Sequence, residues 1–429
     1  MKHRGRHRRR RRGKALRAAL AGTALALTAA ATLISASQAT VAGDPGALKP
    51  LTGPDGTAAL RLTEDRVPRP WLDRLASAMG RPVGVGDALA DADRTLTDAA
   101  DCPAAEKQAL PVEPAATRAY CWGAADTKGW RPGAVTTSGD ADDDGRWGDH
   151  RVILSAWSRD TGTAADGQAR VAFVDASDPA DVTYTWALLA VPVDGGRDYR
   201  ALLSPVSGMV WYQDKLLVTA GSGDREALYV YDVHRIQRAT VGTDAVGRVT
   251  GGWAAAGARF VLPAVASYRL PAGPGVPRPD SISLDRSTAP DSLVASERVP
   301  ADAGRPTRLW RYAFSADPAR SGLLATDSTG HVPVVEAFRT KTTDVRGVLA
   351  YGSAWYLAGA AREPGGHGTL WRQDTSGAQA TECGADATRR CWSGRPGPLS
   401  YGEKTGEVWS QSGRMLFALP LESIDRSVD

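Results

Sequence analysis

The sequence is poor in the residue types and motifs from which many catalytic and metal sites are built. Its 429 residues include six histidines and four cysteines, with no Gly-x-Ser-x-Gly nucleophile elbow, no His-Glu-x-x-His motif and no Cys-x-x-Cys pair. No glycine-rich phosphate loop precedes a helical pattern. A serine hydrolase of the elbow type, a zinc protease and a nucleotide-binding enzyme are therefore not indicated. The histidines beyond residue 42 are widely spaced and are interpreted as loop or surface residues: His150, His234, His331 and His367.

Acidic residues are missing from the first 42 positions. Residues 1–17 contain ten Lys and Arg, and the uncharged stretch 18–42 follows with an apolar core and small residues near its end. This pattern predicts a signal peptide over residues 1–42 and a secreted, extracellular protein. An uncleaved membrane anchor is the alternative, because the stretch is just long enough to span about 30 Å.

The basic charge of the chain belongs to this leader. The whole sequence has 52 basic and 48 acidic residues, and the leader holds ten of the basic ones and none of the acidic ones. The remainder is therefore mildly acidic, so the sequence gives no basis for nucleic-acid binding.

The four cysteines form two pairs that are close in sequence. Cys102 lies near Cys121, and Cys383 lies near Cys391. An even number of cysteines in an exported chain is typical of disulfides, and pairing within each neighbouring pair is the predicted connectivity among the three that four cysteines allow.

A pattern of short strands and turns recurs five times after residue 120. In the clearest copy, three β-favouring runs at Met209–Tyr212, Lys215–Ala220 and Leu228–Asp232 are separated by polar or glycine-rich turns. Further strands are predicted over 184–191, 259–265 and 332–338, and the tryptophans are interpreted as packing between sheets. The copies cover residues 133–175, 208–232, 280–312, 347–359 and 398–419.

These repeats predict an all-β fold for residues 120–429. Five four-stranded units in series indicate a β-propeller of five blades, with six blades as the alternative count. A β-sandwich is the other architecture that regularly spaced strands fit. Residues 43–119 are richer in Ala, Asp and Leu and are predicted to be a partly helical N-terminal segment or linker, with helical patterns over 68–79 and 87–100.

One acidic loop resembles a calcium-binding loop. Asp140, Asp142 and Asp144 alternate ahead of Gly145, as in the Asp-x-Asp-x-Asp-Gly opening of EF-hands and of integrin-α-type propeller loops. These three residues are the predicted ligands and Asp149 is a predicted fourth, although an EF-hand would have glutamate where Arg151 stands. The alternative is a polar hairpin tip whose carboxylates are solvated. Calcium is the only cofactor predicted.

Several short motifs in order resemble a family of uncharacterised secreted proteins from actinomycetes. They are Arg131–Ser138, Gly208–Tyr212, Ser281–Arg286, Asp291–Val294 and Gly397–Tyr401, within residues 120–424. The resemblance implies a propeller fold and secretion, and it supplies no catalytic residues. A weaker resemblance is to gluconolactonase-type propellers, whose central metal is held by Glu, Asn and Asp. This sequence contains no asparagine.

The predicted function is binding of an extracellular ligand, glycan or protein without catalysis. The loops 138–149, 270–278 and 363–368 are expected to cluster on one face of the ring. The competing hypothesis is a metal-dependent hydrolase or lactonase with its site in the central channel. Asp280, Asp285 and Glu336 are the acids near the strands expected to line that channel. Convergence of three or more carboxylate or imidazole groups in the channel would favour that second hypothesis.

Overall fold

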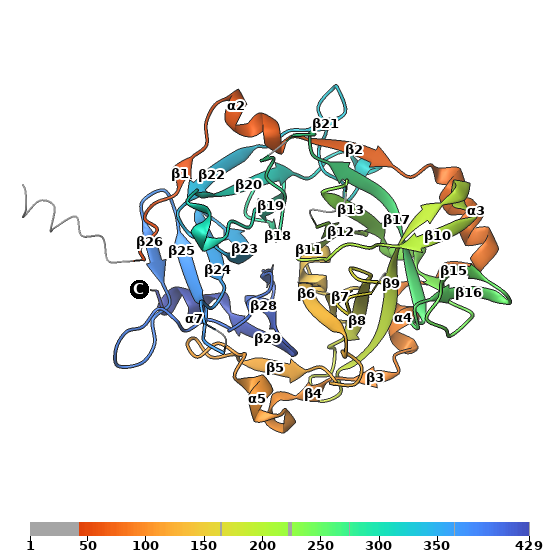
Figure 1. The fold of residues 1–429 in the computed structure, drawn as a ribbon, viewed down its shortest axis with the longest axis horizontal. Coiled ribbons are helices and arrows are strands. Elements are labelled where there is room, and N and C mark those ends of the chain that lie inside the picture. Colours follow the sequence, from red (N-terminus) through yellow and green to blue (C-terminus); the bar gives the residue numbers. More distant parts are fainter. Residues whose placement is uncertain (1–42, 164, 222–224, 274, 364, 429) are drawn as a thin grey trace, which may run out of the picture. The chain divides into compact units, whose positions relative to one another are not determined.

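The structure is a computed structural model that describes residues 43–429 except 164, 222–224, 274, 364 and 429. The predicted signal peptide of residues 1–42 lies outside the described residues. Residues 46–429 form one compact unit, in which the strands are arranged as blades around a centre (Figure 1). The unit is a five-bladed β-propeller, so the predicted fold class is confirmed.

Each blade is an antiparallel sheet of four main strands. The first blade contains β6 (Trp130–Thr137), β7 (Val152–Arg159), β8 (Ala169–Asp175) and β9 (Thr183–Val193). The second contains β11 (Met209–Tyr212), β12 (Lys215–Thr219), β13 (Leu228–Asp232) and β17 (Phe260–Arg269). The third contains β18 (Ser281–Asp285), β19 (Ser292–Ser296), β20 (Thr307–Ala313) and β22 (Glu336–Thr340). The fourth contains β23 (Val345–Tyr351), β24 (Ala354–Gly359), β25 (Thr369–Gln373) and β26 (Ala378–Ala380).

The fifth blade closes the ring with a strand from the N-terminal part of the chain. Its first three strands are β27 (Ser400–Gly402), β28 (Glu407–Ser412) and β29 (Met415–Pro420), and its outer strand is β5 (Arg118–Cys121). Closure of this kind satisfies the edge of the last sheet with a segment from before the first blade.

Burial on both sheet faces explains why the repeated runs become blade strands. In β7 and β8 nearly every residue is buried, as expected for sheets that pack against neighbours on both sides. Several buried tryptophans pack between blades: Trp122, Trp157 and Trp186 form one aromatic cluster, with ring centroids 5.5–6.3 Å apart, that packs against the fifth blade. Their predicted structural role fits this packing.

Residues 46–119 run along the outside of the ring. The short strands β1 (Lys49–Pro50), β2 (Leu62–Arg66) and β3 (Arg94–Thr95) pair with β22, β17 and β9, and β4 (Thr97–Asp98) pairs with β5. The segment therefore contributes edge strands to four of the five blades in the part of the chain that the structure describes.

The two helical patterns predicted in this segment had different outcomes. Helix α3 (Arg69–Met79) is present and buries Leu72, Leu75 and Met79, as its spacing predicted. The helix predicted over 87–100 is wrong beyond α4 (Val85–Ala90), because the residues that follow pair with blade edges as β3 and β4. Similarly, the strand predicted over 332–338 is divided between β21 (His331–Val332) and β22.

Smaller elements complete the chain. They are the strands β10 (Asp198–Ala201), β14 (Gln237–Arg238), β15 (Val246–Val249) and β16 (Gly252–Ala255), and the helices α2 (Pro54–Thr57), α5 (Ala104–Lys107), α6 (Ser138–Ala141) and α7 (Leu421–Arg426). Among the described residues, no helix has the length and apolar character that a membrane crossing requires.

The two faces of the ring differ in the connections that they carry. The inner strands β6, β11, β18 and β23 end on one face, which we call the turn face. Contacts between blades join these ends: the backbone N–H of Gln213 donates to the Ala141 carbonyl, and the backbone N–H of Gly352 donates to Ser287 Oγ. The loop 138–149 follows the end of β6 and lies on the turn face. The loop 270–278 precedes β18, and 363–368 follows the end of β24, beside the start of β23. The expected clustering of these three loops is therefore wrong, because the last two lie on the opposite face.

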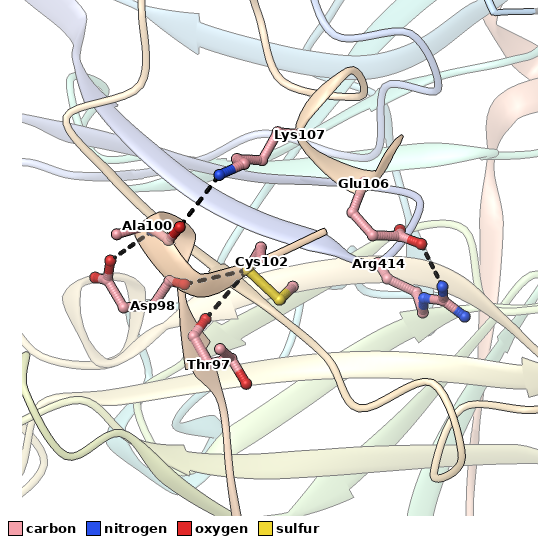
Figure 2. Close-up of a disulfide and its surroundings, with 8 residues drawn as sticks. Thr97, Asp98, Ala100, Cys102, Glu106, Lys107 and Arg414 are labelled. Atoms are coloured by element: carbon pink, nitrogen blue, oxygen red, sulfur yellow. Dashed lines mark hydrogen bonds and ion pairs between the residues drawn. A yellow bond between two sulfur atoms is a disulfide. The ribbon is translucent and has the colours of Figure 1, made fainter. Parts of the chain in front are cut away.

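Both predicted disulfides, Cys102–Cys121 and Cys383–Cys391, are present. Cys121 ends β5, so the first disulfide ties the closing strand to the preceding segment (Figure 2). Nearby, Arg414 at the β28–β29 turn forms an ion pair with Glu106, and Lys107 Nζ donates to the Ala100 carbonyl.

The position of the first disulfide leads to a prediction. Replacing Cys102 and Cys121 together with alanine should lower the free energy of unfolding by about 3 kcal/mol, because a crosslink of this length constrains the unfolded chain and β5 closes the ring. Replacing Cys383 and Cys391 should cost less, because that loop spans 8 residues against 19. Denaturant unfolding of both double variants checks this order, and a larger loss for the second pair would contradict it.

Candidate functional site

A cavity of about 810 Å³ opens on the turn face. It is lined by the β6–β7 loop of the first blade, the β11–β12 turn and the segment after β13 in the second, and the β18–β19 and β20–β22 connections of the third. We call it the turn-face groove. Its volume lies within the usual range for small-molecule sites, about 300–1,000 Å³.

Aromatic side chains form one part of the groove lining. Trp147 is half-buried, with its ring centroid 4.8 Å from that of the buried Trp211 and 5.7 Å from the imidazole of His234. Tyr212 is almost fully buried and stacks on Phe314 at 4.0 Å. The packing behind Trp147 and Tyr212 fixes both rings, and their accessible portions offer a rigid surface to a ligand.

Carboxylates form much of the remaining lining. Four aspartates from the three blades border the groove, and no Lys or Arg is among the described lining residues. These aspartates are Asp142, Asp214, Asp291 and Asp317. The groove thus combines an aromatic surface with an excess of negative charge.

Two cations stand behind the lining, and each is shared between carboxylates. Lys215 forms ion pairs with Asp214 and, at 3.3 Å, with Asp232. Arg286 forms ion pairs with Asp143 and, at 3.3 Å, with Asp291. Sharing leaves the region with a net negative charge.

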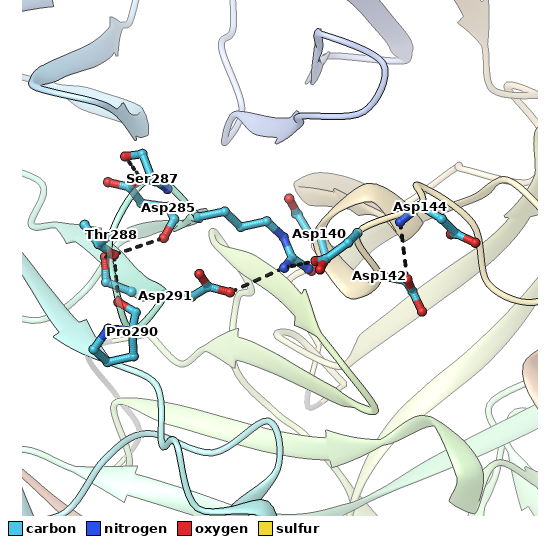
Figure 3. A network of polar contacts seen from close by, with 11 residues as sticks. Asp140, Asp142, Asp144, Asp285, Ser287, Thr288, Pro290 and Asp291 are labelled. Atoms are coloured by element: carbon cyan, nitrogen blue, oxygen red, sulfur yellow. Dashed lines mark hydrogen bonds and ion pairs between the residues drawn. The ribbon is translucent and has the colours of Figure 1, made fainter.

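Arg286 also joins the groove to the centre of the ring. Its Nη2 donates to the backbone carbonyl of Asp140 at 2.7 Å, and Figure 3 shows the chain of contacts from Asp291 to the Asp140 loop. Burial raises the pKa of Asp291, against the Tyr212 hydroxyl and the Arg286 charge, which lower it. Arg286 thereby fixes the relative position of the first-blade and third-blade walls.

Asp140 lies in the interior and does not face the groove. Its Oδ2 accepts hydrogen bonds from the hydroxyls of Thr136 at 2.5 Å and Ser400 at 2.8 Å. Its Oδ1 is buried without a partner among the described residues. Burial raises the pKa of Asp140 to about 6, although both hydroxyls and the charge of Arg286 lower it.

The structure separates the four residues predicted to bind calcium. Asp140 is buried with Thr136 and Ser400, whereas Asp142, Asp144 and Asp149 are exposed. Asp142 and Asp144 each accept a backbone N–H from two residues further on, at 3.3 and 2.7 Å, and so stabilise their own turn. Calcium binding by these residues stays a prediction, and it would require Asp140 to leave its two hydroxyl donors.

Two of the acids expected near the channel, Asp285 and Glu336, are engaged in ion pairs with one arginine. Asp285 is fully buried and pairs with Arg311, which also contacts Glu336 at 2.8 Å. Asp280 is largely buried, which raises the pKa of its carboxyl against the charges of Arg346 and Arg298. Among the residues that the structure describes, no three His, Cys, Asp or Glu side chains are placed to hold a metal ion.

Sequence analysis identified only part of the groove. The loop chosen for its aspartates supplies Asp142 and also Trp147, whose role was missed. His234 was interpreted as a surface residue and is exposed, but it borders the groove. Asp291 and Asp317 were missed, although their Pro-Asp and Asp-Pro sequences mark turns that the repeat places on the same face.

No protein-family model and no curated protein matches the sequence. Solved structures that resemble the chain include a gluconolactonase from Xanthomonas campestris, with 13% identity, a TM-score of 0.30 and coverage of 77% of this chain and 98% of that one. The Cps50 (Swd1) β-propeller domain from Myceliophteria thermophila has 10% identity, a TM-score of 0.29 and coverage of 68% and 84%. The match to the tricorn protease has 11% identity and a TM-score of 0.27, and it covers 70% of this chain and 26% of that one.

These likenesses concern the fold alone, since every identity is below 15% and every TM-score is low. They give no information about ligands or activity. The resemblance to a secreted actinomycete family stays a prediction.

The buried Asp140 carboxyl predicts how stability depends on pH. Its pKa is about 6 in the folded protein and 3.8 as an unperturbed group, so the folded state binds the proton more tightly. This tighter proton binding stabilises the folded state by about 3 kcal/mol in total. The contribution is fully present below about pH 4 and is lost as the pH rises through 6. Asp140→Asn cannot ionise, so its stability relative to wild type should rise between pH 4 and pH 7.5.

Urea unfolding at several pH values measures this difference. The matched control is Asp142→Asn, which removes an exposed carboxylate of the same loop and leaves the Asp140 hydrogen bonds in place. A constant difference between wild type and Asp140→Asn across the range would contradict the assignment.

Proposed function

We propose that the protein is a secreted, non-catalytic propeller that binds an extracellular ligand in the turn-face groove. The observation that carries this proposal is the combination of a cavity of about 810 Å³ with a fixed aromatic surface and uncompensated polar groups. Apolar surface provides binding free energy, and a small number of polar groups fix the ligand's orientation.

The backbone at the groove supports this proposal. Gln213, at the turn between β11 and β12, has a φ of 54°, in the left-handed region where side chains other than Gly, Asn or Asp are uncommon. Its amide donates to the Ala141 carbonyl at 3.1 Å, and its side-chain oxygen accepts from Ser321 Oγ at 2.6 Å. The strained residue thus connects the three blades that line the groove, and such strain is concentrated at functional sites.

Export is part of the proposal and rests on two features. The leader pattern of residues 1–42 is typical of a signal peptide, and the two disulfides suit an oxidising compartment. We expect the protein in the culture medium to begin near Gly43 when its N-terminus is sequenced. A cell-associated protein that retains residues 1–42 would instead indicate a membrane anchor.

A ligand screen with matched variants tests the site. We expect a compound from a panel of amines, amino acids, sugars and short peptides to raise the unfolding midpoint of wild type, since a ligand at 100 times its Kd adds about 2.7 kcal/mol. Trp147→Ala should abolish this rise. Tyr351→Ala is the control, because Tyr351 ends β23 on the same face, is 37% exposed and does not line the groove.

Two results would contradict the proposal. The first is a ligand-induced rise of equal size in wild type and Trp147→Ala, which would place binding elsewhere. The second is metal-dependent hydrolysis of a lactone or ester that survives Trp147→Ala, which would favour a hydrolase with its site in the channel.

A further inference from the structure

The charges around the turn-face groove indicate the class of ligand, and this inference rests on the proposed function. Four aspartates line the groove and no Lys or Arg is among its described lining residues. Asp232 lies behind the lining and Asp143 is exposed beside it, and each shares a cation with a lining aspartate, Lys215 or Arg286. A third cation, Arg320, is near enough to Asp317 to interact with its charge, but it forms its ion pair with Glu64. Carboxylates therefore outnumber cations around the groove. An anionic ligand would be repelled, and a neutral one would leave this charge uncompensated.

Two of the lining carboxylates are available to a ligand. Asp142 and Asp317 are exposed, and no ion pair of either is found among the described residues. The Arg320 charge, which interacts with that of Asp317, is paired with Glu64. In each, Oδ1 accepts one backbone N–H, from Asp144 at 3.3 Å and from Ala319 at 2.9 Å. The Oδ2 of each accepts no hydrogen bond from the described residues, so both can bind an N–H donor of a ligand.

The aromatic surface of the groove also favours a cationic ligand. Tyr212 already has the Arg286 guanidinium 5.5 Å from its ring centroid. Trp147 carries no Arg or Lys over its ring in the described part of the chain, and tryptophan is the best partner for a cation–π contact. Trp147 can therefore contact either the cationic group of a ligand or the carbon chain beside it.

We propose that the turn-face groove binds a small organic cation that carries ammonium or guanidinium groups. Asp142 and Asp317, which come from the first and third blades, receive the cationic groups, and Trp147 packs against the carbon chain. The cavity volume suits a compound of this size. No covalent step is involved.

Isothermal titration calorimetry with spermidine and agmatine tests the proposal on residues 43–429. N,N′-diacetylputrescine is the neutral control compound, and we expect it not to bind. Asp142→Asn combined with Asp317→Asn should weaken binding of the cations at least about tenfold, because both charged acceptors are lost. Binding should also weaken as salt rises from 0.02 to 0.3 M.

A matched double variant controls for the change in net charge. Asp244→Asn combined with Asp302→Asn removes two exposed carboxylates that do not line the groove, and it should bind as wild type does. The four substituted residues are exposed, and equal unfolding midpoints without ligand would confirm that both variants fold. A second variant, Trp147→Ala, should weaken binding while leaving its salt dependence unchanged.

The remaining outcomes distinguish this inference from the proposed function. If a neutral sugar binds with dependence on Trp147 and the cations do not, the groove is a ligand site and the cation proposal is wrong. If tetralysine binds and neither small cation does, the small-ligand proposal is also wrong. Cation binding that both double variants weaken equally would indicate attraction to the overall charge, and it would overturn the proposed site.

Discussion

The hydrogen bonds that meet at Asp140 join four blades at the centre of the turn face. Thr136, from the same blade, accepts the Trp211 amide of the second blade at 3.0 Å and donates to the Asp140 carboxyl. Ser400 donates from the fifth blade, and Arg286 donates from the third to the Asp140 backbone. A carboxyl buried in this way would be costly if its donors were lost, so these contacts constrain how the inner strands end.

The groove depends on that junction. Arg286 reaches from the third blade to the Asp140 backbone, and the Gln213 amide reaches from the second blade to the neighbouring Ala141 carbonyl. Together they hold the three blades at the separation that leaves a cavity. Because Arg286 is committed to Asp143, Asp291 and the Asp140 carbonyl, it cannot neutralise the outer carboxylates, which stay available to a ligand.

The repeating part of the fold could be predicted from local pattern alone. In Met209–Tyr212 and its counterparts, the alternation of β-favouring runs and turns predicts where each strand lies. The first strand of each repeat is then the innermost strand of its blade. The edge strands β3 and β4 could not be predicted, because their short segments are stabilised by partners far along the chain. The aspartate loop singled out in the sequence borders the groove, but the inward direction of Asp140 depends on Ser400, 260 residues away.

The most direct test of this account is a crystal structure of residues 43–429 grown with saturating spermidine. The account predicts electron density for the ligand in the turn-face groove, with its nitrogens within hydrogen-bond distance of Asp142 and Asp317 and its chain against Trp147. Spermidine bound in the central channel or on the opposite face, with an empty groove, would contradict it.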